Sequence, residues 1–212
     1  MKSETSGKSR QGLFFHFLCC ILAGSLLTGC AFSRTPVKLS FSPIVKQPLK
    51  AEHKGAIEVG EVKDSRLVSD PLVLMHKANQ YGPTSGAYVT EVPVATIFRD
   101  GLKLALEQNG FTATNAVNYE LHAELQNFGI GSIQNGLFSD ITSKSWLEVR
   151  FELVERSTGQ PVWHDTFTGK FTEPLSQWTG ADGKFIAKVF SEVSQEVVKR
   201  LISDKSFRNF FE

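Results

Sequence analysis

An uncharged apolar run near the N-terminus, Leu13–Leu27, constrains most strongly what this chain can fold into. Three basic residues precede the run and small residues follow it, which is the order of a secretory signal. The run has fifteen residues, whereas a membrane-spanning helix needs about 20. We therefore predict that residues 1–29 are a signal peptide and that only the remaining 183 residues form the mature protein.

The run closes on Leu27-Thr28-Gly29-Cys30. Small side chains at Thr28 and Gly29 give a peptidase access to the backbone, and the Cys30 thiol can carry a lipid. The pattern resembles the lipobox of bacterial lipoproteins. That resemblance implies cleavage between Gly29 and Cys30, with a diacylglycerol and an N-acyl chain on Cys30 as the only attached groups and no other cofactor. The alternatives are an ordinary signal peptide and a buried helix that happens to contain a cysteine.

The same resemblance predicts the location of the protein. Mature lipoproteins carry two or three acyl chains, and more than one chain makes membrane attachment effectively stable. Ala31 follows the cysteine where an aspartate would retain the protein at the inner membrane. We therefore expect a lipid-anchored protein of the outer membrane that faces the periplasm.

The charge and cysteine content of the mature chain exclude some classes of protein. Twenty basic and 21 acidic residues remain after the signal, so the net charge is about −1 and there is no basic stripe for a nucleic acid. Cys30 is the only cysteine left, so no disulfide holds the domain together. A chain of this length can bury enough apolar surface for one core.

Residues 30–55 are predicted to be a tether. Three prolines break any helix, and four lysines keep the segment solvated. Fully extended, about 25 residues reach roughly 80 Å. Part of the segment is expected to pack, because Leu39-Ser40-Phe41 alternates like a short edge strand.

Residues 56–212 are predicted to form a single α/β domain. Alternating and helical apolar patterns predict an α+β fold, a two-layer sandwich in which a mostly antiparallel sheet of four to five strands carries two long helices on one face. Residues 67–90 are ambiguous, and the glycines of 129–136 predict a loop. The expected strands are 56–62, 119–128, 146–156 and 162–171, the expected helices are 94–109 and 182–203, and the apolar tail 207–211 is expected to dock.

Two glycines refine the first helix. Gly110 lies where a left-handed residue ends a helix. Gly101 lies inside the helix, where glycine costs up to about 1 kcal/mol relative to alanine, and this suggests close packing on the sheet.

No pattern in the chain indicates catalysis or a metal site. Gly129 and Gly131 begin a dinucleotide-binding pattern, but Gln134 replaces its third glycine and a strand follows instead of a helix. The mature histidines lack the spacing of metal ligands. We therefore predict no catalytic, cofactor-binding or metal-binding residue, and no enzyme.

Two features suggest a surface for a partner. Asp64 and Arg66 follow the first strand and are predicted either to grip a partner or to form an ion pair on a solvated turn. Trp146 and Trp178 lie outside the predicted apolar faces and indicate a binding surface, unless the tether or the C-terminal tail covers them.

The order of these features resembles the YajG family of bacterial lipoproteins over most of the mature chain. The resemblance implies location and fold, and it transfers no catalytic residue. The hairpin Thr158-Gly159-Gln160-Pro161-Val162-Trp163 also resembles the auxiliary lipoproteins of ABC-type lipid transport systems. The chain departs from the YajG family in its long hydrophilic N-region and its longer 71–92 segment. The residues that carry the first resemblance are Leu39–Pro43, Asp64–Arg66, Leu106–Phe111, Asn118–Leu121 and Ser203–Phe210.

The leading functional hypothesis is a non-catalytic accessory or binding module of the cell envelope with an envelope protein as its partner. The alternative is the auxiliary subunit of an ABC-type intermembrane lipid transport system, which predicts an apolar groove between sheet and helices. A hydrolase is the third possibility, and it predicts a cleft in which titratable side chains converge.

Overall fold

The computed structural model describes residues 33–41, 56–79, 82–112, 117–134, 141–175 and 182–211. The predicted signal peptide, Cys30 and most of the predicted tether lie outside these ranges. The chain divides into two compact units, the smaller around residues 76–87 and the larger from residues 35–75 and 88–212.

A mixed four-stranded sheet forms the base of the larger unit, in the order β2-β5-β6-β7. β2 (Ala56–Asp64) runs parallel to β5 (Val117–Gln134), and β5–β6 and β6–β7 are antiparallel pairs. A parallel pair needs a long crossover, and helix α2 (Val94–Gln108) lies in the segment between β2 and β5. β6 (Ile141–Glu155) and β7 (Gln160–Leu175) are joined by a tight turn in which Gly159 has a φ of 67°.

Alternating side chains fix which face of this sheet is buried. Period-two patterning places every second residue of a strand on one face. On β6 the side chains of Leu147, Val149, Phe151 and Leu153 are fully buried, as predicted. The residues between them, including Trp146, Arg150 and Glu152, lie on the opposite face.

Helix α2 ends as its sequence predicts. Gly110 has a φ of 80°, Phe111 N–H donates to Leu106 O at 3.0 Å, and Gly110 N–H donates to Glu107 O at 3.1 Å. These two bonds form a Schellman motif, which satisfies carbonyls at the helix end. The motif also turns Phe111 into the core, where its ring contacts those of Phe207 and Phe211.

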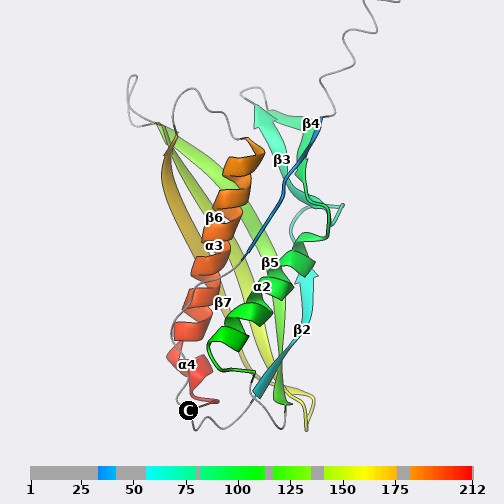
Figure 1. Ribbon diagram of the computed structural model, residues 1–212, viewed down its shortest axis with the longest axis vertical. Helices are drawn as coiled ribbons and strands as arrows, with labels where there is room; N and C mark the ends of the chain where they lie inside the picture. Colours follow the sequence, from blue (N-terminus) through cyan, green and yellow to red (C-terminus); the bar gives the residue numbers. More distant parts are fainter. Residues whose placement is uncertain are drawn as a thin grey trace, which may run out of the picture. The chain divides into compact units, whose positions relative to one another are not determined.

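Helix α3 (Gly183–Ser203) begins at Asp182, whose carboxylate accepts a hydrogen bond from Phe185 N–H at 2.7 Å. It packs closely on β7, because a β-carbon built on Gly169 would lie 2.0 Å from Val193 O. Both α2 and α3 cover the same face of the four-stranded sheet (Figure 1). A short helix α4 (Lys205–Arg208) follows, and the buried Phe207 and Phe211 confirm that the C-terminal tail docks.

Residues 35–41 run between the two long helices (Figure 1). The exposed fractions of Val37 and Phe41 are only 3% and 7%. Phe41 stacks on Phe98 of α2, and a β-carbon on Gly101 would lie 1.7 Å from Phe41 Cδ1. Gly101 therefore accommodates Phe41, which corrects the prediction that this glycine packs on the sheet.

A second, three-stranded sheet has the order β1-β4-β3 and was not predicted. Its strands are β1 (Arg34–Pro36), β3 (Val73–Asn79) and β4 (Gly82–Val89), the last two from the ambiguous segment. In the smaller unit, Ala87 N–H donates to Ser33 O at 3.2 Å. In the larger unit, Val37 N–H donates to Val89 O at 2.7 Å.

The α+β class is confirmed, and two details of the predicted layout are corrected. The described residues form two sheets, where one was predicted. β5 also continues through Gly129–Gln134, where a glycine-rich loop was predicted. These glycines are tolerated within the strand because Trp146 of the neighbouring strand lies across Gly129 and replaces the missing side chain.

Candidate functional site

The face of the four-stranded sheet that points away from the helices is the candidate functional site, and we call it the open face. Antiparallel sheets commonly have one face on the core and one in water. The open face has two regions that differ in chemistry: a charged region on β2, β5 and β6, and a region around Trp146.

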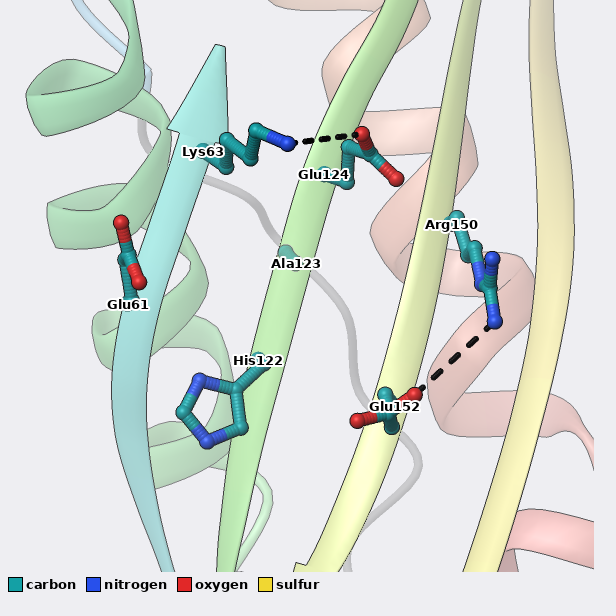
Figure 2. Close-up of a pocket in the computed structure, with 7 residues that line it drawn as sticks. All are labelled: Glu61, Lys63, His122, Ala123, Glu124, Arg150 and Glu152. Atoms are coloured by element: carbon teal, nitrogen blue, oxygen red, sulfur yellow. Dashed lines mark ion pairs between the residues drawn. The ribbon is translucent and has the colours of Figure 1, made fainter. Parts of the chain in front are cut away.

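The charged region contains a shallow hollow of about 310 Å³. Figure 2 shows its side chains projecting from three neighbouring strands. Lys63 Nζ lies 3.7 Å from Glu124 Oε1, and Arg150 Nη2 lies 3.9 Å from Glu152 Oε2. The cations of this hollow are thus already paired with carboxylates. Its lining is Glu61, Lys63, His122, Ala123, Glu124, Arg150 and Glu152.

The carboxyl of Glu124, in this hollow, has a lowered pKa. Its pKa is lowered chiefly because Ser65 Oγ donates a hydrogen bond to Glu124 Oε1 at 2.6 Å, with Lys63 as a smaller contribution. The hydrogen bond favours the ionised form. Glu124 is therefore held as an anion, which suits an ion-pair network better than a general acid.

A second group of charges continues the network along the same face. Arg156 pairs with Glu58 and lies 3.9 Å from Glu120 Oε2. His122 Nε2 lies 3.5 Å from the other oxygen of Glu120. Exposed pairs of this kind contribute at most about 1 kcal/mol each, so they define a surface pattern more than they stabilise the fold.

The region around Trp146 has a different construction. Trp146 on β6 is opposite Gly129 on β5 and Lys170 on β7. A β-carbon on Gly129 would lie 2.2 Å from Trp146 Cζ2, so the indole lies directly over the glycine backbone. A β-carbon on Gly131 would lie 3.8 Å from Trp146 Cζ3, in ordinary van der Waals contact with the indole. Trp146 is therefore a partly exposed aromatic side chain on the open face, as the sequence indicates.

Asp64 and Arg66 form a largely buried ion pair. The exposed fraction of Arg66 is only 6%, and its guanidinium makes a bidentate contact with Asp64, with distances of 2.8 and 2.6 Å. It also donates to Leu74 O at 2.8 Å and Val73 O at 3.2 Å. These contacts link the end of β2 to the start of β3. The predicted ion pair is present, and it lies in a largely buried position instead of on a solvated turn.

A second hollow, of about 540 Å³, lies between α2 and the free edge of β2. Its lining mixes apolar strand residues with charged helix residues of both signs. It is not an apolar groove of the kind that would hold an acyl chain. Its lining is Ile57, Glu58, Val59, Arg99, Asp100, Lys103, Glu107, Thr112 and Val117.

The other predicted site residues fall outside the described ranges. These are Gly29, Cys30 and Trp178. Within the described ranges, no helix has both the length and the apolar character to cross a bilayer. The same part of the chain contains no cluster of three histidine, cysteine or acidic side chains placed to hold a metal.

No family model and no curated protein matches this chain. Among solved structures, a Xanthomonas campestris protein of the family DUF330 has a TM-score of 0.54 at 17% identity, covering 80% of this chain and 92% of that one. This likeness shows a shared fold. A minor lipoprotein from Acinetobacter baumannii has a TM-score of 0.38 at 18% identity, with 57% and 91% of the two chains covered. A candidate lipoprotein from Caulobacter crescentus has a TM-score of 0.38 at 14% identity, with 51% and 76% covered. These two likenesses are too weak to support an inference.

Sequence reasoning missed the lysines beside Trp146 and the burial of Arg66. Alternation along β6 places Lys144 on the same face as Trp146, and that signal was available in the sequence. The position of Lys170 depends on the β6–β7 register, and that of Arg66 on carbonyls of a strand that was not predicted.

Proposed function

We propose that the protein is a non-catalytic lipoprotein of the bacterial envelope, anchored to the outer membrane through acyl chains on Cys30 and acting as a binding module in the periplasm. The Leu27–Cys30 pattern and Ala31 support the anchor and its location. The YajG-like resemblance supports the same assignment. An accessory role next to a membrane needs only a weak interface, because anchoring raises the local concentration of the partner.

The closed space between α2 and α3 is the observation that carries this proposal. Val37 and Phe41 occupy that space, and Phe41 stacks on Phe98. The lipid-transport alternative predicts an apolar groove between sheet and helices, whereas a binding module needs a closed core and an exposed surface. The buried side chains of Val37 and Phe41 and the partly exposed Trp146 favour the binding module over the auxiliary subunit of a lipid transporter.

A non-catalytic role is further supported by the chemistry of the open face. Several of its acids and His122 lie on exposed strand positions and pair with neighbouring charges, as Glu120 does with His122 and Arg156. Catalytic acids and bases work best where water is excluded and their pKa values are tuned toward neutrality. A carboxyl that acts as a general acid at neutral pH needs a raised pKa, whereas the pKa of Glu124 is lowered.

The experiment that tests the proposal compares the full chain with its Cys30→Ala variant in a Gram-negative host. Membrane fractions are separated, acylation is followed with labelled palmitate, and cross-linked partners and co-purified lipids are identified by mass spectrometry. We expect palmitate on the native chain in outer-membrane fractions, none on the variant, and an envelope protein among the adducts.

Two results would contradict the proposal. Equal membrane partition of the native chain and the Cys30→Ala variant would show that Cys30 carries no lipid anchor. Stoichiometric co-purified phospholipid, together with cross-links to a transport complex, would show that the protein is the auxiliary subunit of a lipid transporter and not a binding module.

A further inference from the structure

The indole of Trp146 presents a flat aromatic surface on the open face. Its six-membered ring lies over Gly129, and the adjacent Gly131 adds no side chain beside it. One face of the ring is packed against the strand, and the side chain remains partly exposed. We name the Trp146 ring, the two glycines, Lys144 and Lys170 the indole platform.

The two lysines of the indole platform are exposed and form no ion pair or hydrogen bond with any described residue. Lys170 is directly opposite Trp146 on β7, and Lys144 is two residues before it on β6. In the charged region of the same face, by contrast, Lys63, Arg150 and Arg156 are each paired with a carboxylate. Two unpaired ammonium groups beside one aromatic ring, against the single carboxylate of Glu148, are complementary to an anionic ligand.

The remaining side chains around the ring are polar. Glu148 shares the face of Trp146, and its cross-strand partners are Asn127 and Thr168, while Thr172 is opposite Lys144. Trp146 is therefore the single apolar side chain in this group. A protein interface has a predominantly apolar centre, and a membrane-inserting surface needs several apolar side chains. This group offers one stacking surface ringed by hydrogen-bonding groups.

We propose that the indole platform binds an anionic glycan. The apolar C–H face of a sugar ring packs on the electron-rich face of the indole. Lys144 and Lys170 bind carboxylate or phosphate groups on that sugar or its neighbours through charge-assisted hydrogen bonds. The inference rests on the proposed function only in taking the protein to be a binding module, and it names the class of ligand for that module.

Binding is measured with the full chain in detergent micelles, by isothermal titration calorimetry at low and high salt. The probes are polygalacturonate for carboxylate glycans, deacylated lipopolysaccharide for phosphate glycans and dextran as the neutral glycan. Phosphatidylglycerol vesicles test a lipid surface. We expect salt-sensitive binding to polygalacturonate or to deacylated lipopolysaccharide, and at least tenfold weaker binding to dextran.

Variants locate the binding. Lys144→Glu with Lys170→Glu is expected to weaken binding at least tenfold, and so is Trp146→Ala, whereas Trp146→Phe retains the stacking surface and is expected to change affinity less than threefold. The matched control is Lys184→Glu with Lys205→Glu. It makes the same change in charge at two exposed, unpaired lysines of α3 and α4 and is expected to leave affinity within twofold.

The inference is overturned if the native chain binds neither anionic glycan, or binds dextran equally well. It is also overturned if vesicles are the only probe bound, or if the platform variants and the control lose affinity alike. If Trp146→Ala fails to fold, the double variant Lys144→Glu with Lys170→Glu still tests the inference. If glycan binding fails but palmitate labelling and cross-links to an envelope protein are still found, the proposed function stands and only this inference is wrong.

Discussion

The ring of Phe41 stacks on the ring of Phe98, with centroids 5.7 Å apart and planes inclined by 11°. Phe41 comes from the segment predicted to be a tether, and Phe98 belongs to helix α2. Gly101 makes the contact possible, since any β-carbon there would overlap the Phe41 ring. The lead-in segment is thus part of the core of the larger unit.

Gly101→Ala is expected to destabilise the native chain by about 1–3 kcal/mol, because it overpacks the space that Phe41 fills. In a helix without this contact, the same change stabilises by up to about 1 kcal/mol. The sign should therefore reverse when Gly101→Ala is made in a Phe41→Ala background. Urea unfolding of the four chains measures both values. Stabilisation by Gly101→Ala in the native background would show that Phe41 does not pack there.

Arg66→Met is expected to lower the free energy of unfolding by about 3–5 kcal/mol, because it leaves the Asp64 carboxylate largely buried without its partner. Arg156→Met is the control, since Arg156 pairs with Glu58 in the exposed charged region and its loss should cost at most about 1 kcal/mol. Equal costs in chemical unfolding would mean that Arg66 is no more than another surface charge.

Gly169→Ala is expected to destabilise the fold by about 1–3 kcal/mol or more, because the new β-carbon meets the backbone carbonyl of Val193. Gly131→Ala makes the same change on β5 of the same sheet, where the nearest atoms are 3.8 and 3.9 Å away. There alanine should be neutral or stabilise by about 0.5–1 kcal/mol. Thermal unfolding compares the two variants with the native chain. Similar changes in Tm for Gly169→Ala and Gly131→Ala would contradict the close approach of α3 to β7.

Ser65→Ala is expected to raise the pKa of Glu124, because it removes the hydrogen bond that is the main cause of the lowered value. A carboxyl whose pKa is lower in the folded chain contributes stability above its unfolded pKa of about 4.5 and loses it as the pH falls through the folded value. The variant should therefore be less acid-sensitive than the native chain below that pH. Carbon-13 NMR titration of glutamate side chains measures the shift. Ser65→Thr keeps the hydroxyl and should keep the low pKa.

Helices and their ends were the best-predicted parts of this fold. Both long helices carry apolar stripes at helical spacing, and local residues mark their limits, as Gly110 does for α2 and Asp182 for α3. The inward faces of β6 and the docking of Phe207 and Phe211 followed from the same patterning. Such features depend on neighbours a few residues away, so the sequence carries them directly.

The parts that sequence reasoning missed depend on distant residues. The local sequence around Gly129 predicts a loop. The strand β5 continues through Gly129 because Trp146 of the neighbouring strand packs over this glycine. Arg66 reads as a surface charge until the carbonyls of Val73 and Leu74 are in place around it. At the candidate site, Trp146 was predicted to be exposed, whereas its pairing with Lys170 required the register of β6 and β7.

The burial of Val37 limits how far the domain can move from the lipid anchor. Val37 lies only seven positions after Cys30, and even a fully extended chain of that length spans at most about 25 Å, far less than the roughly 80 Å expected of an unpacked segment. With Cys30 acylated as proposed, the larger unit stays within a thin layer next to the bilayer, and its ligands must come to the membrane surface to meet it. Tension on the lipid anchor would be borne first at Val37, whose N–H donates to Val89 O, because little slack chain remains to absorb it.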